Sequence, residues 1–307
     1  MDKIFLIAIL IGILSRFIML NIDNSQYPTK PNTILNQFIL AFVASSLGAL
    51  LVPALIERSY TSITFLSLAA EQFRQVREAM RNSLENQEDG QLVKRGGPFI
   101  EEIARTYEVR NYMCIISSFL TVASFYLITA EFKIDENIAI FIGSALGLIL
   151  SFVMKKLLSR PQIGEIADIN VVEISFVNDS ILKVGELQGI TNVGLAEDRK
   201  RFLEKGIGLE IVPKDNNYGY AGIIQDAGQR DAIIYNLYSR LGIYRESYEV
   251  SFYPLPRRNP NNESLVIAYL PLEKNVEKAI EAIKSAPVLS SARNKNLCLK
   301  DFSINTK

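Results

Sequence analysis

The sequence predicts a helical membrane protein with four transmembrane helices and a cytosolic α/β domain. Three observations predict this class. Apolar runs of membrane length lie in the first half of the chain, lysine and arginine gather on alternate loops, and the second half alternates between strand-like and helix-like patterns. The expected divisions are a transmembrane hairpin, cytosolic amphipathic helices, a second transmembrane hairpin and the α/β domain, at residues 1–56, 57–111, 112–160 and 161–307.

The composition excludes several classes of function. The 307 residues carry 33 basic and 33 acidic side chains, so the chain lacks the basic excess of a nucleic-acid-binding protein. The absence of histidine rules out Ser-His-Asp triads and HExxH zinc sites. Two cysteines, Cys114 and Cys298, are too few for a zinc site made of cysteine alone. We therefore expect no metal and no cofactor.

The first two apolar runs are residues 4–20 and 34–56. The first run is interrupted only by Ser15 and Arg16 and lacks a small-residue cleavage site, so it predicts an uncleaved span. Arg16 is expected to extend toward the nearer interface, although a position facing the other helices stays open. The second run contains Ser45-Ser46-Leu47-Gly48, and these small residues predict close packing on another helix.

Residues 60–84 predict a long amphipathic helix outside the spans. Its apolar stripe comprises Leu66, Ala69, Phe73, Val76 and Met80, and a basic row of Arg74, Arg77 and Arg81 lies beside it. We interpret it as a helix packed on its neighbour with a solvated charged face. A basic face on anionic headgroups and a helical dimer seam are the alternatives.

The third and fourth spans are expected at residues 112–130 and 138–154, where Gly143 and Gly147 form a GxxxG pattern. This pattern favours packing within the chain and leaves homo-oligomerisation open. Within residues 1–160, most basic side chains lie in the long loop between the second and third spans or directly after the fourth span. They are Arg58, Arg74, Arg77, Arg81, Lys94, Arg95, Arg105, Arg110, Lys155, Lys156 and Arg160. The other loops hold only Lys30 and Lys133. The positive-inside rule thus predicts that both termini and the long loop are cytosolic.

The remaining residues predict the α/β domain. Asn178-Asp179 lies between two strand-like runs and predicts a hairpin of residues 171–177 and 181–187. A charged helix follows at residues 195–205, closed by Gly206. The next elements form a ferredoxin-like β-α-β-β-α-β order, with a strand, a helix, two strands, a helix and a last strand at residues 207–212, 226–241, 248–253, 265–270, 276–284 and 297–302.

A candidate docking face lies where the long loop enters the third span. The stretch GGPFIEEIARTYEVRNYM, from Gly96, predicts a helix that begins near Pro98 and continues into the membrane. Glu101 and Arg105 lie one turn apart, in the order that favours an ion pair. We assign partner docking to four residues of this stretch, namely Glu101, Arg105, Tyr107 and Arg110.

The α/β domain offers one candidate ligand site. Gln229 and Arg230 lie in the first turn of the helix at residues 226–241, where free backbone N–H groups favour anions. A solvated helix start without a ligand is the alternative. Gly206-Ile207-Gly208 is a lone GxG, which more often ends a helix and opens a strand than binds phosphate.

The sequence assigns no catalytic residue. A serine nucleophile activated by lysine needs no histidine, but no lysine is expected at the depth of the span serines, which are Ser45, Ser46, Ser117 and Ser118. Glu101 and Glu102 are adjacent on a helix and point apart, so they are not expected to share a proton.

The stretch that begins at Gly96 resembles a segment of a known family. Phe99-Ile100-Glu101-Glu102-Ile103-Ala104 resembles the signature of the YIEGIA family, membrane proteins of endospore-forming bacteria, with Phe99 in place of its tyrosine and Glu102 in place of its glycine. Three further segments are similar to that family, at residues 160–168, 192–195 and 228–230. The resemblance implies a role in sporulation, dormancy or germination, and a complex with a small soluble partner protein. It supplies no catalytic residue.

Together these observations predict a multi-span protein of the cell membrane, with a spore or forespore membrane implied by the resemblance. Its cytosolic domain is expected to regulate or bind protein partners rather than to catalyse a reaction. The alternative is a membrane-embedded protease or hydrolase that uses no histidine. A small-molecule sensor is a third interpretation.

Overall fold

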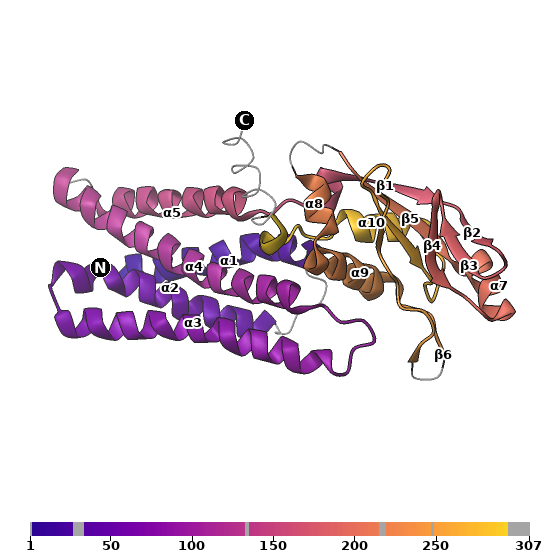
Figure 1. The fold of residues 1–307 in the computed structure, drawn as a ribbon. Helices are drawn as coiled ribbons and strands as arrows, with labels where there is room; N and C mark the ends of the chain where they lie inside the picture. Colours follow the sequence, from indigo (N-terminus) through magenta and orange to yellow (C-terminus); the bar gives the residue numbers. More distant parts are fainter. Residues whose placement is uncertain (1, 27–33, 133–134, 215–218, 247–248, 294–307) are drawn as a thin grey trace, which may run out of the picture. The chain divides into compact units, whose positions relative to one another are not determined.

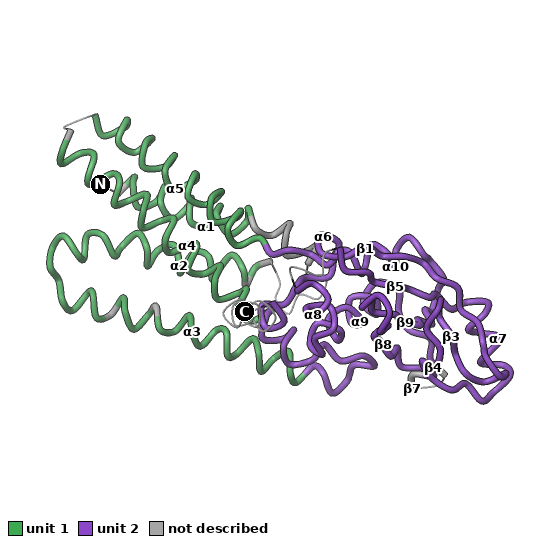
Figure 2. Tube along the Cα trace, turned by 45° about the horizontal axis from the view of Figure 1, so that its top comes forward, with its two compact units in different colours: residues 1–86, 103–159 green, residues 87–102, 160–307 purple. Residues whose placement is uncertain are grey.

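The computed structural model describes residues 2–26, 34–132, 135–214, 219–246 and 249–293. The chain divides into two compact units, which Figure 2 shows in different colours. Unit 1 comprises residues 1–86 and 103–159, and unit 2 comprises residues 87–102 and 160–307. The segment 87–102 therefore belongs with the α/β domain, although the sequence divided the chain at residue 161.

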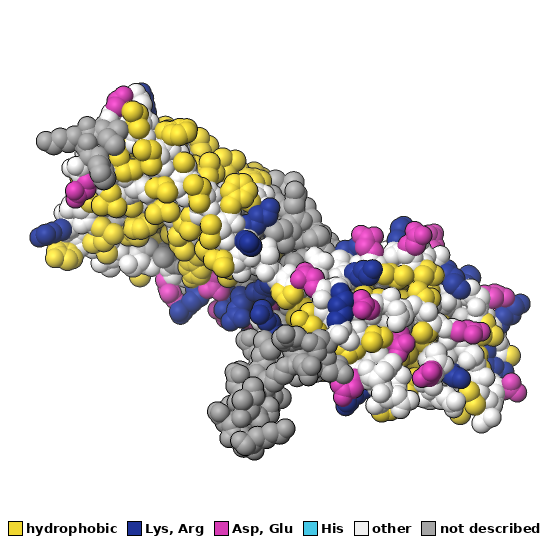
Figure 3. All heavy atoms as spheres, turned by 90° about the horizontal axis from the view of Figure 1, so that it is seen from above, with side chains coloured by type: hydrophobic (Ala, Val, Ile, Leu, Met, Phe, Trp, Pro, Cys, Tyr) yellow, Lys and Arg dark blue, Asp and Glu magenta, His cyan; other side chains and the backbone are white. Residues whose placement is uncertain are grey.

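Unit 1 is a helical bundle (Figure 1), built from α1 (Asp2–Gln26), α2 (Ile34–Ile56), α3 (Tyr60–Glu88), α4 (Gly97–Phe132) and α5 (Glu136–Leu158). Among the described residues, three helices are long and apolar enough to cross a membrane, at Gln37–Ile56, Gly97–Glu131 and Glu136–Leu158. The first expected span, residues 4–20, lies in α1, which is not one of these three. Figure 3 shows hydrophobic side chains covering one face of the bundle, whereas charges of both signs are spread over unit 2.

Helices of the bundle that follow one another in the chain run in opposite directions. One apolar cluster joins Ile4 and Ala8 to Ala49, Val52, Val122, Phe125 and Ala139. A second cluster joins Ile13 to Ala41, Ala44, Phe73 and Cys114. From the first cluster to the second, residue numbers rise along α1 and fall along α2 and α4. α3 begins at the turn after α2 and reaches the second cluster at Phe73, so it runs in the same direction as α1. In α5, Ala139 belongs to the first cluster and Gly147 lies against Ile11, so α5 also runs in this direction. Consequently α1, α3 and α5 run parallel to one another and antiparallel to α2 and α4.

These directions give the bundle two distinct ends. The N-terminal end holds Asp2, the turn between α2 and α3, and the start of α5. At the other end, which we call the connecting end, the chain passes into unit 2 after α5. The sequence predicted that the start of α1 and the end of α5 lie on the same side of the membrane and that residues 57–111 lie outside the transmembrane helices. The structure differs because α3 folds back along α2, a direction that an amphipathic pattern does not encode.

Small residues allow close contacts between the bundle helices. A Cβ atom built on Gly48 would lie 2.1 Å from the Ile115 carbonyl oxygen, and one on Gly147 would lie 2.1 Å from Thr121 Oγ1. Both positions thus require glycine, as the small-residue patterns predicted. Arg16 is only 2 % exposed, and its Nη1 donates to Asn111 Oδ1 at 2.6 Å. The prediction that Arg16 extends to the interface is therefore wrong, because the side chain points into the bundle.

Unit 2 is built around a four-stranded antiparallel sheet in the order β1 (Ala167–Val172), β5 (Ile207–Pro213), β9 (Leu265–Tyr269) and β8 (Arg257–Arg258). A second antiparallel sheet contains β2 (Ile174–Val177), β3 (Ile181–Val184) and β4 (Leu187–Asn192). Its side chains share a core with β9 and Phe202. A small hairpin pairs β6 (Arg245–Glu246) with β7 (Glu249–Val250).

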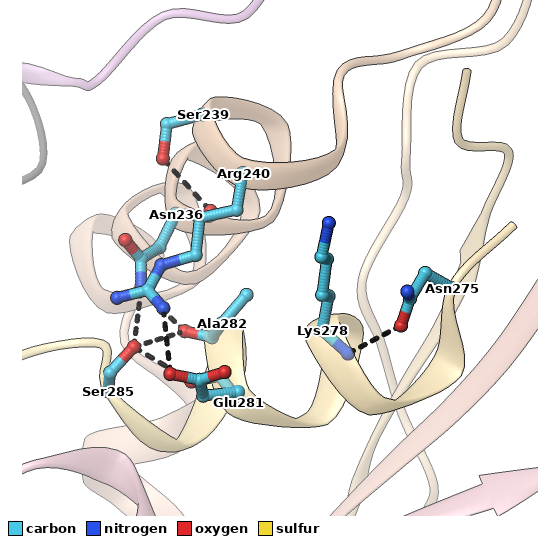
Figure 4. A network of polar contacts seen from close by, with 8 residues as sticks. All are labelled: Asn236, Ser239, Arg240, Asn275, Lys278, Glu281, Ala282 and Ser285. Atoms are coloured by element: carbon cyan, nitrogen blue, oxygen red, sulfur yellow. Dashed lines mark hydrogen bonds and ion pairs between the residues drawn. The ribbon is translucent and has the colours of Figure 1, made fainter. Parts of the chain in front are cut away.

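The helices of unit 2 are α6 (Ile163–Ile166), α7 (Ala196–Lys205), α8 (Tyr220–Gln225), α9 (Ala227–Leu241) and α10 (Val276–Lys284). Polar contacts fix α9 on α10 (Figure 4). The Asn236 Nδ2 atom donates to the Ala282 carbonyl oxygen, and Arg240 lies 3.5 Å from Glu281. Asn275 caps α10 by accepting a 2.9 Å hydrogen bond from the Lys278 amide. The position of α9 is thereby set from its C-terminal half.

Most predicted elements of unit 2 are present, but the ferredoxin-like order is not confirmed. The hairpin around Asn178-Asp179 forms, and both residues take the positive φ angles that such turns need, 52° and 56°. Residues 248–253 contribute only β7, outside the main sheet, because Pro254 and Pro256 follow and lack the N–H groups of a ladder. The strand expected at residues 297–302 lies outside the described residues.

The assignment of residues 87–102 to unit 2 predicts complementation between two parts of that unit. A fragment of residues 160–307 lacks Phe99 and Ile100, which are buried in the whole chain. This fragment should melt at a lower temperature than the complete unit 2, which also contains residues 87–102. Adding a peptide of residues 87–104 should raise the melting temperature of the fragment. A peptide with Phe99→Ala is the matched control. If the wild-type peptide leaves the melting temperature unchanged, the segment is not part of the folded unit.

Candidate functional site

The candidate site is a short segment of unit 2, residues 286–290, which we call the hub segment. Three consecutive backbone N–H groups of this segment donate to three different parts of the chain. The Val288 amide donates to the Pro161 carbonyl oxygen at 3.0 Å. The Leu289 amide donates to Gln229 Oε1 at 2.7 Å, and the Ser290 amide donates to Glu102 Oε2 at 3.3 Å. The hub segment thus joins parts of the sequence that are far apart.

The first partner is the chain around Pro161. The Ile163 amide donates to the Ala286 carbonyl oxygen at 2.9 Å, and Gln162 forms an antiparallel bridge with Pro287. These contacts, with the Val288 bond, make a short two-stranded pairing. A capping box at Gln162 then starts α6 at once. The chain therefore leaves the hub segment as a helix turn and enters β1.

The second partner is the first turn of α9. Asp226 Oδ1 caps this helix by accepting bonds from the amides of Gly228, at 3.0 Å, and Gln229, at 3.4 Å. The Gln229 side chain is 0 % exposed, and its Nε2 donates to the Pro287 carbonyl oxygen at 2.9 Å. Both the nitrogen and the oxygen of the Gln229 side-chain amide bond to the hub segment, so Gln229 has a structural role here. The cap also occupies the backbone N–H groups that had suggested an anion site, and Arg230 is half-buried beside it.

The third partner is Glu102, whose carboxylate is 4 % exposed. It forms an ion pair with Arg160 and accepts a hydrogen bond from Ser290 Oγ at 3.2 Å. The guanidinium of Arg160 donates to Ser290 Oγ at 2.9 Å. A buried carboxylate is costly unless it is paired and hydrogen-bonded, and Glu102 meets both conditions. It therefore fixes the start of α4 to the hub segment.

Close packing places Glu102 where it can make these bonds. Gly96 has a φ angle of +81° and turns the chain into α4. Pro98 lies against α9, so that a Cβ atom on Gly228 would be 2.7 Å from it. The ring of Phe99 meets the ring of Tyr235 edge-on, with centroids 6.0 Å apart. A larger residue at position 228 would push the start of α4 away from α9.

A second buried ion pair closes the loop before α4. The Glu88 carboxylate accepts from the amides of Arg95, at 2.9 Å, and Gly96, at 3.3 Å. It also lies 3.3 Å from the Arg95 guanidinium, which stacks 4.8 Å above the ring of Tyr235. One glutamate thus holds both ends of residues 88–96, and Arg95 ties them to α9.

Burial raises the pKa of the Asp231 carboxyl, which lies next to Gly96; Arg230 opposes this shift, and Asp226 and Glu88 add to it. Because the folded state binds this proton more tightly than the unfolded chain, unit 2 loses stability as the pH rises through the range in which Asp231 titrates.

The four predicted docking residues lie in α4 with different exposure. Arg105 is exposed and Glu101 is half-buried. Tyr107 and Arg110 are buried within unit 1, so their side chains are not on the surface of that unit. Docking by these residues stays a prediction, and its exposed part reduces to Arg105 and Glu101.

Sequence reasoning missed the residues that make the site. Glu102 and Arg160 were named without being connected, and Ser290 was not singled out, because nothing in local spacing connects residues 102, 160 and 290. Arg95 was counted only among the basic residues that orient the chain, and Glu88 was not singled out. The available signal was the resemblance, since three of the four resembling segments contact the hub segment or its immediate partners, at residues 99–104, 160–168 and 228–230. The fourth, at residues 192–195, lies by the second sheet.

The chemistry of the site is that of a structural junction. Its charged groups bond one another or backbone amides, and no group of three metal-ligating side chains occurs among the residues that the structure describes. A cleft of about 360 Å³ opens beside the hub segment, lined by residues that include Pro161, Tyr220, Val288 and Arg293.

Comparison with known proteins relates this arrangement to a family. Residues 4–299 match the family model described as "YIEGIA protein". The chain is 32 % identical over 285 residues to "Uncharacterized protein YphB" of Bacillus subtilis (strain 168), and this alignment covers 93 % of the chain and 91 % of that protein. No solved structure matches the chain. The matched region covers most of both units and every partner of the hub segment, and the chain therefore belongs to the YIEGIA family.

Proposed function

We propose that this chain is a regulatory protein of the cell membrane, whose unit 2 binds protein partners in the cytosol during sporulation, dormancy or germination. The observation that carries the proposal is the convergence of three family segments on the hub segment. Those segments build a junction from buried, mutually bonded groups, which suits a protein that holds or changes a conformation.

The connectivity of the chain supports a coupling role. The chain passes between the units after residues 86, 102 and 159. The ion pair between Glu102 and Arg160 joins the two residues at the boundaries after 102 and 159. The pair between Glu88 and Arg95 lies just after the boundary at residue 86. Because α4 is one continuous helix, a displacement of its first turn is carried along its axis. A partner that loosens the hub segment would thereby act on the membrane helices.

The hydroxyl groups of the bundle favour packing over catalysis. Ser45 Oγ donates to the Ala41 carbonyl oxygen at 2.7 Å, and Ser118 Oγ donates to the Cys114 carbonyl oxygen at 2.9 Å. Such bonds to the preceding turn are common in membrane helices. Labelling of one of these serines by a serine-directed covalent probe would instead support the alternative of a histidine-free protease or hydrolase.

The first prediction of the proposed function concerns the ion pair. Glu102→Ala should destabilise the protein by up to about 3 kcal/mol, because it leaves Arg160 without its buried partner. Glu102→Leu combined with Arg160→Leu should cost less than the sum of the single variants. Thermal melting of the purified full-length protein measures both effects. Arg258→Ala, an exposed pair partner in unit 2, is the control and should change melting little.

The same variants test the proposed function in sporulating cells. Glu102→Ala should impair spore formation or germination even when its membrane abundance is restored by higher expression. If a variant with a measured loss of stability shows normal spore formation and germination, the junction is not required for the proposed function.

The second prediction concerns partner docking. Arg105→Glu reverses an exposed charge and should lower capture of the soluble partner from sporulating cells, because it places like charges together if the partner is acidic there. Membrane abundance should stay near that of the wild type. Arg258→Glu is the matched control, and equal capture by both variants would remove Arg105 from the docking face.

A further inference from the structure

We infer that the first half of α3, residues 60–70, lies within the membrane against lipid acyl chains, and that the N-terminus of the chain lies on the side of the membrane opposite unit 2. This inference goes beyond the proposed function, since it concerns how the helices of unit 1 meet the bilayer and on which side the N-terminus lies.

The first step is the turn between α2 and α3. The Glu57 amide donates to the Pro53 carbonyl oxygen at 2.9 Å, and the Ser59 amide donates to the Ala54 carbonyl oxygen at 3.1 Å. Arg58 takes a left-handed conformation with a φ angle of 53°. A connection this short returns the chain directly along α2, as Figure 1 shows.

The second step is the depth to which α3 returns. Phe73 belongs to the same apolar cluster as Ala41 and Ala44 of α2. From Tyr60 to Phe73 the helix rises about 20 Å, and from Ile56 back to Ala44 it rises about 18 Å. These lengths agree, so residues 60–73 of α3 lie at the depths of residues 44–56 of α2 along the bundle. If α2 crosses the membrane, the first half of α3 lies at the same depths.

The third step is the composition of this half. Residues 60–70 carry no charge, and Thr64 Oγ1 donates to the Tyr60 carbonyl oxygen at 2.9 Å, which satisfies a hydroxyl without water. Leu68 and Tyr60 are exposed, as are Leu50 and Leu55 on α2, so the apolar surface continues from one helix to the next. That continuity favours lipid over a separate protein partner.

The first charges of α3 appear where the span of α2 ends. Glu71 and Arg74 pair at 2.9 Å, near the level of Phe73. Ala41 lies only four residues from Gln37, the limit of the apolar stretch, which is about 6 Å of helix rise. An exposed arginine at that depth can extend its guanidinium to the interface. The basic row thus marks a membrane surface rather than a wholly cytosolic helix.

The distribution of basic residues then orients the bundle. The N-terminal end carries Lys3, Arg58 and, between α4 and α5, Lys133. The sequence at the connecting end carries Lys30, Lys94, Arg95, Lys155, Lys156 and Arg160. The positive-inside rule places the connecting end in the cytosol. Unit 2 is then cytosolic, as the sequence predicted, but the N-terminus and the α2–α3 turn are outside.

The test uses single cysteines in the full-length protein with Cys114→Ser and Cys298→Ser, labelled in intact cells by an impermeant thiol reagent. Glu57→Cys and Lys3→Cys distinguish the two arrangements, since both positions are outside here and cytosolic in the four-span arrangement. Asn137→Cys should react and Asn86→Cys should stay protected in either case. The inference stands only if both test positions react like Asn137→Cys, and any other pattern overturns it.

Lipid contact is measured separately with a spin label in reconstituted bilayers. A label at Leu68→Cys should be relaxed by oxygen, which concentrates in lipid, more than by a water-soluble nickel complex. The order should reverse for a label at Glu85→Cys. A label at Leu68→Cys that responds more to the nickel complex indicates water, and one shielded from both indicates a protein partner. Either result overturns lipid contact.

Discussion

Three consecutive backbone N–H groups, those of Val288, Leu289 and Ser290, set the structure of unit 2 around them. A buried N–H group without an acceptor is costly, so each of these amides needs a partner. Each finds it in a different segment: a carbonyl after α5, a side-chain amide on α9, and a carboxylate at the start of α4. Moving any one segment leaves an amide unsatisfied, so the three segments are fixed together.

Charge burial adds a second constraint at the same place. Glu102 and Glu88 are both buried, and each is compensated by an arginine and by backbone amides. Such pairs contribute less to net stability than their Coulomb attraction suggests, because desolvation opposes it. Their effect is on arrangement, since a buried carboxylate tolerates few alternative positions. We therefore regard these pairs as what makes the junction specific, and the packing of Pro98 and Phe99 as what makes it stable.

Local patterns in the sequence predicted the elements that local physics determines. Apolar runs predicted the three long apolar helices of unit 1, the small-residue patterns predicted their close contacts, and helical spacing predicted α9 within one residue of its bounds. The direction of α3 was not predictable in this way. An apolar stripe at helical spacing shows which face of a helix is buried, but not the direction in which the helix runs. Arg16 was misread for a related reason: its acceptor, Asn111, is 95 positions away.

The site itself was predictable only from the family resemblance. Glu101 attracted attention because Arg105 lies one turn away, whereas Glu102 makes the buried contacts and its partner Arg160 is remote in sequence. The hub segment offers no side chain with unusual chemistry, since most of its bonds come from the backbone. Residue types alone do not reveal a site of this kind.

Amide hydrogen exchange at residues 288–290 tests the account most directly. In the full-length protein in lipid nanodiscs, all three amides should exchange slowly, and Glu102→Ala should accelerate all three together. An acceleration of about tenfold corresponds to about 1.4 kcal/mol of lost protection. If Glu102→Ala changes only Ser290, or none of the three, the segments are not held as one junction and the central claim is contradicted.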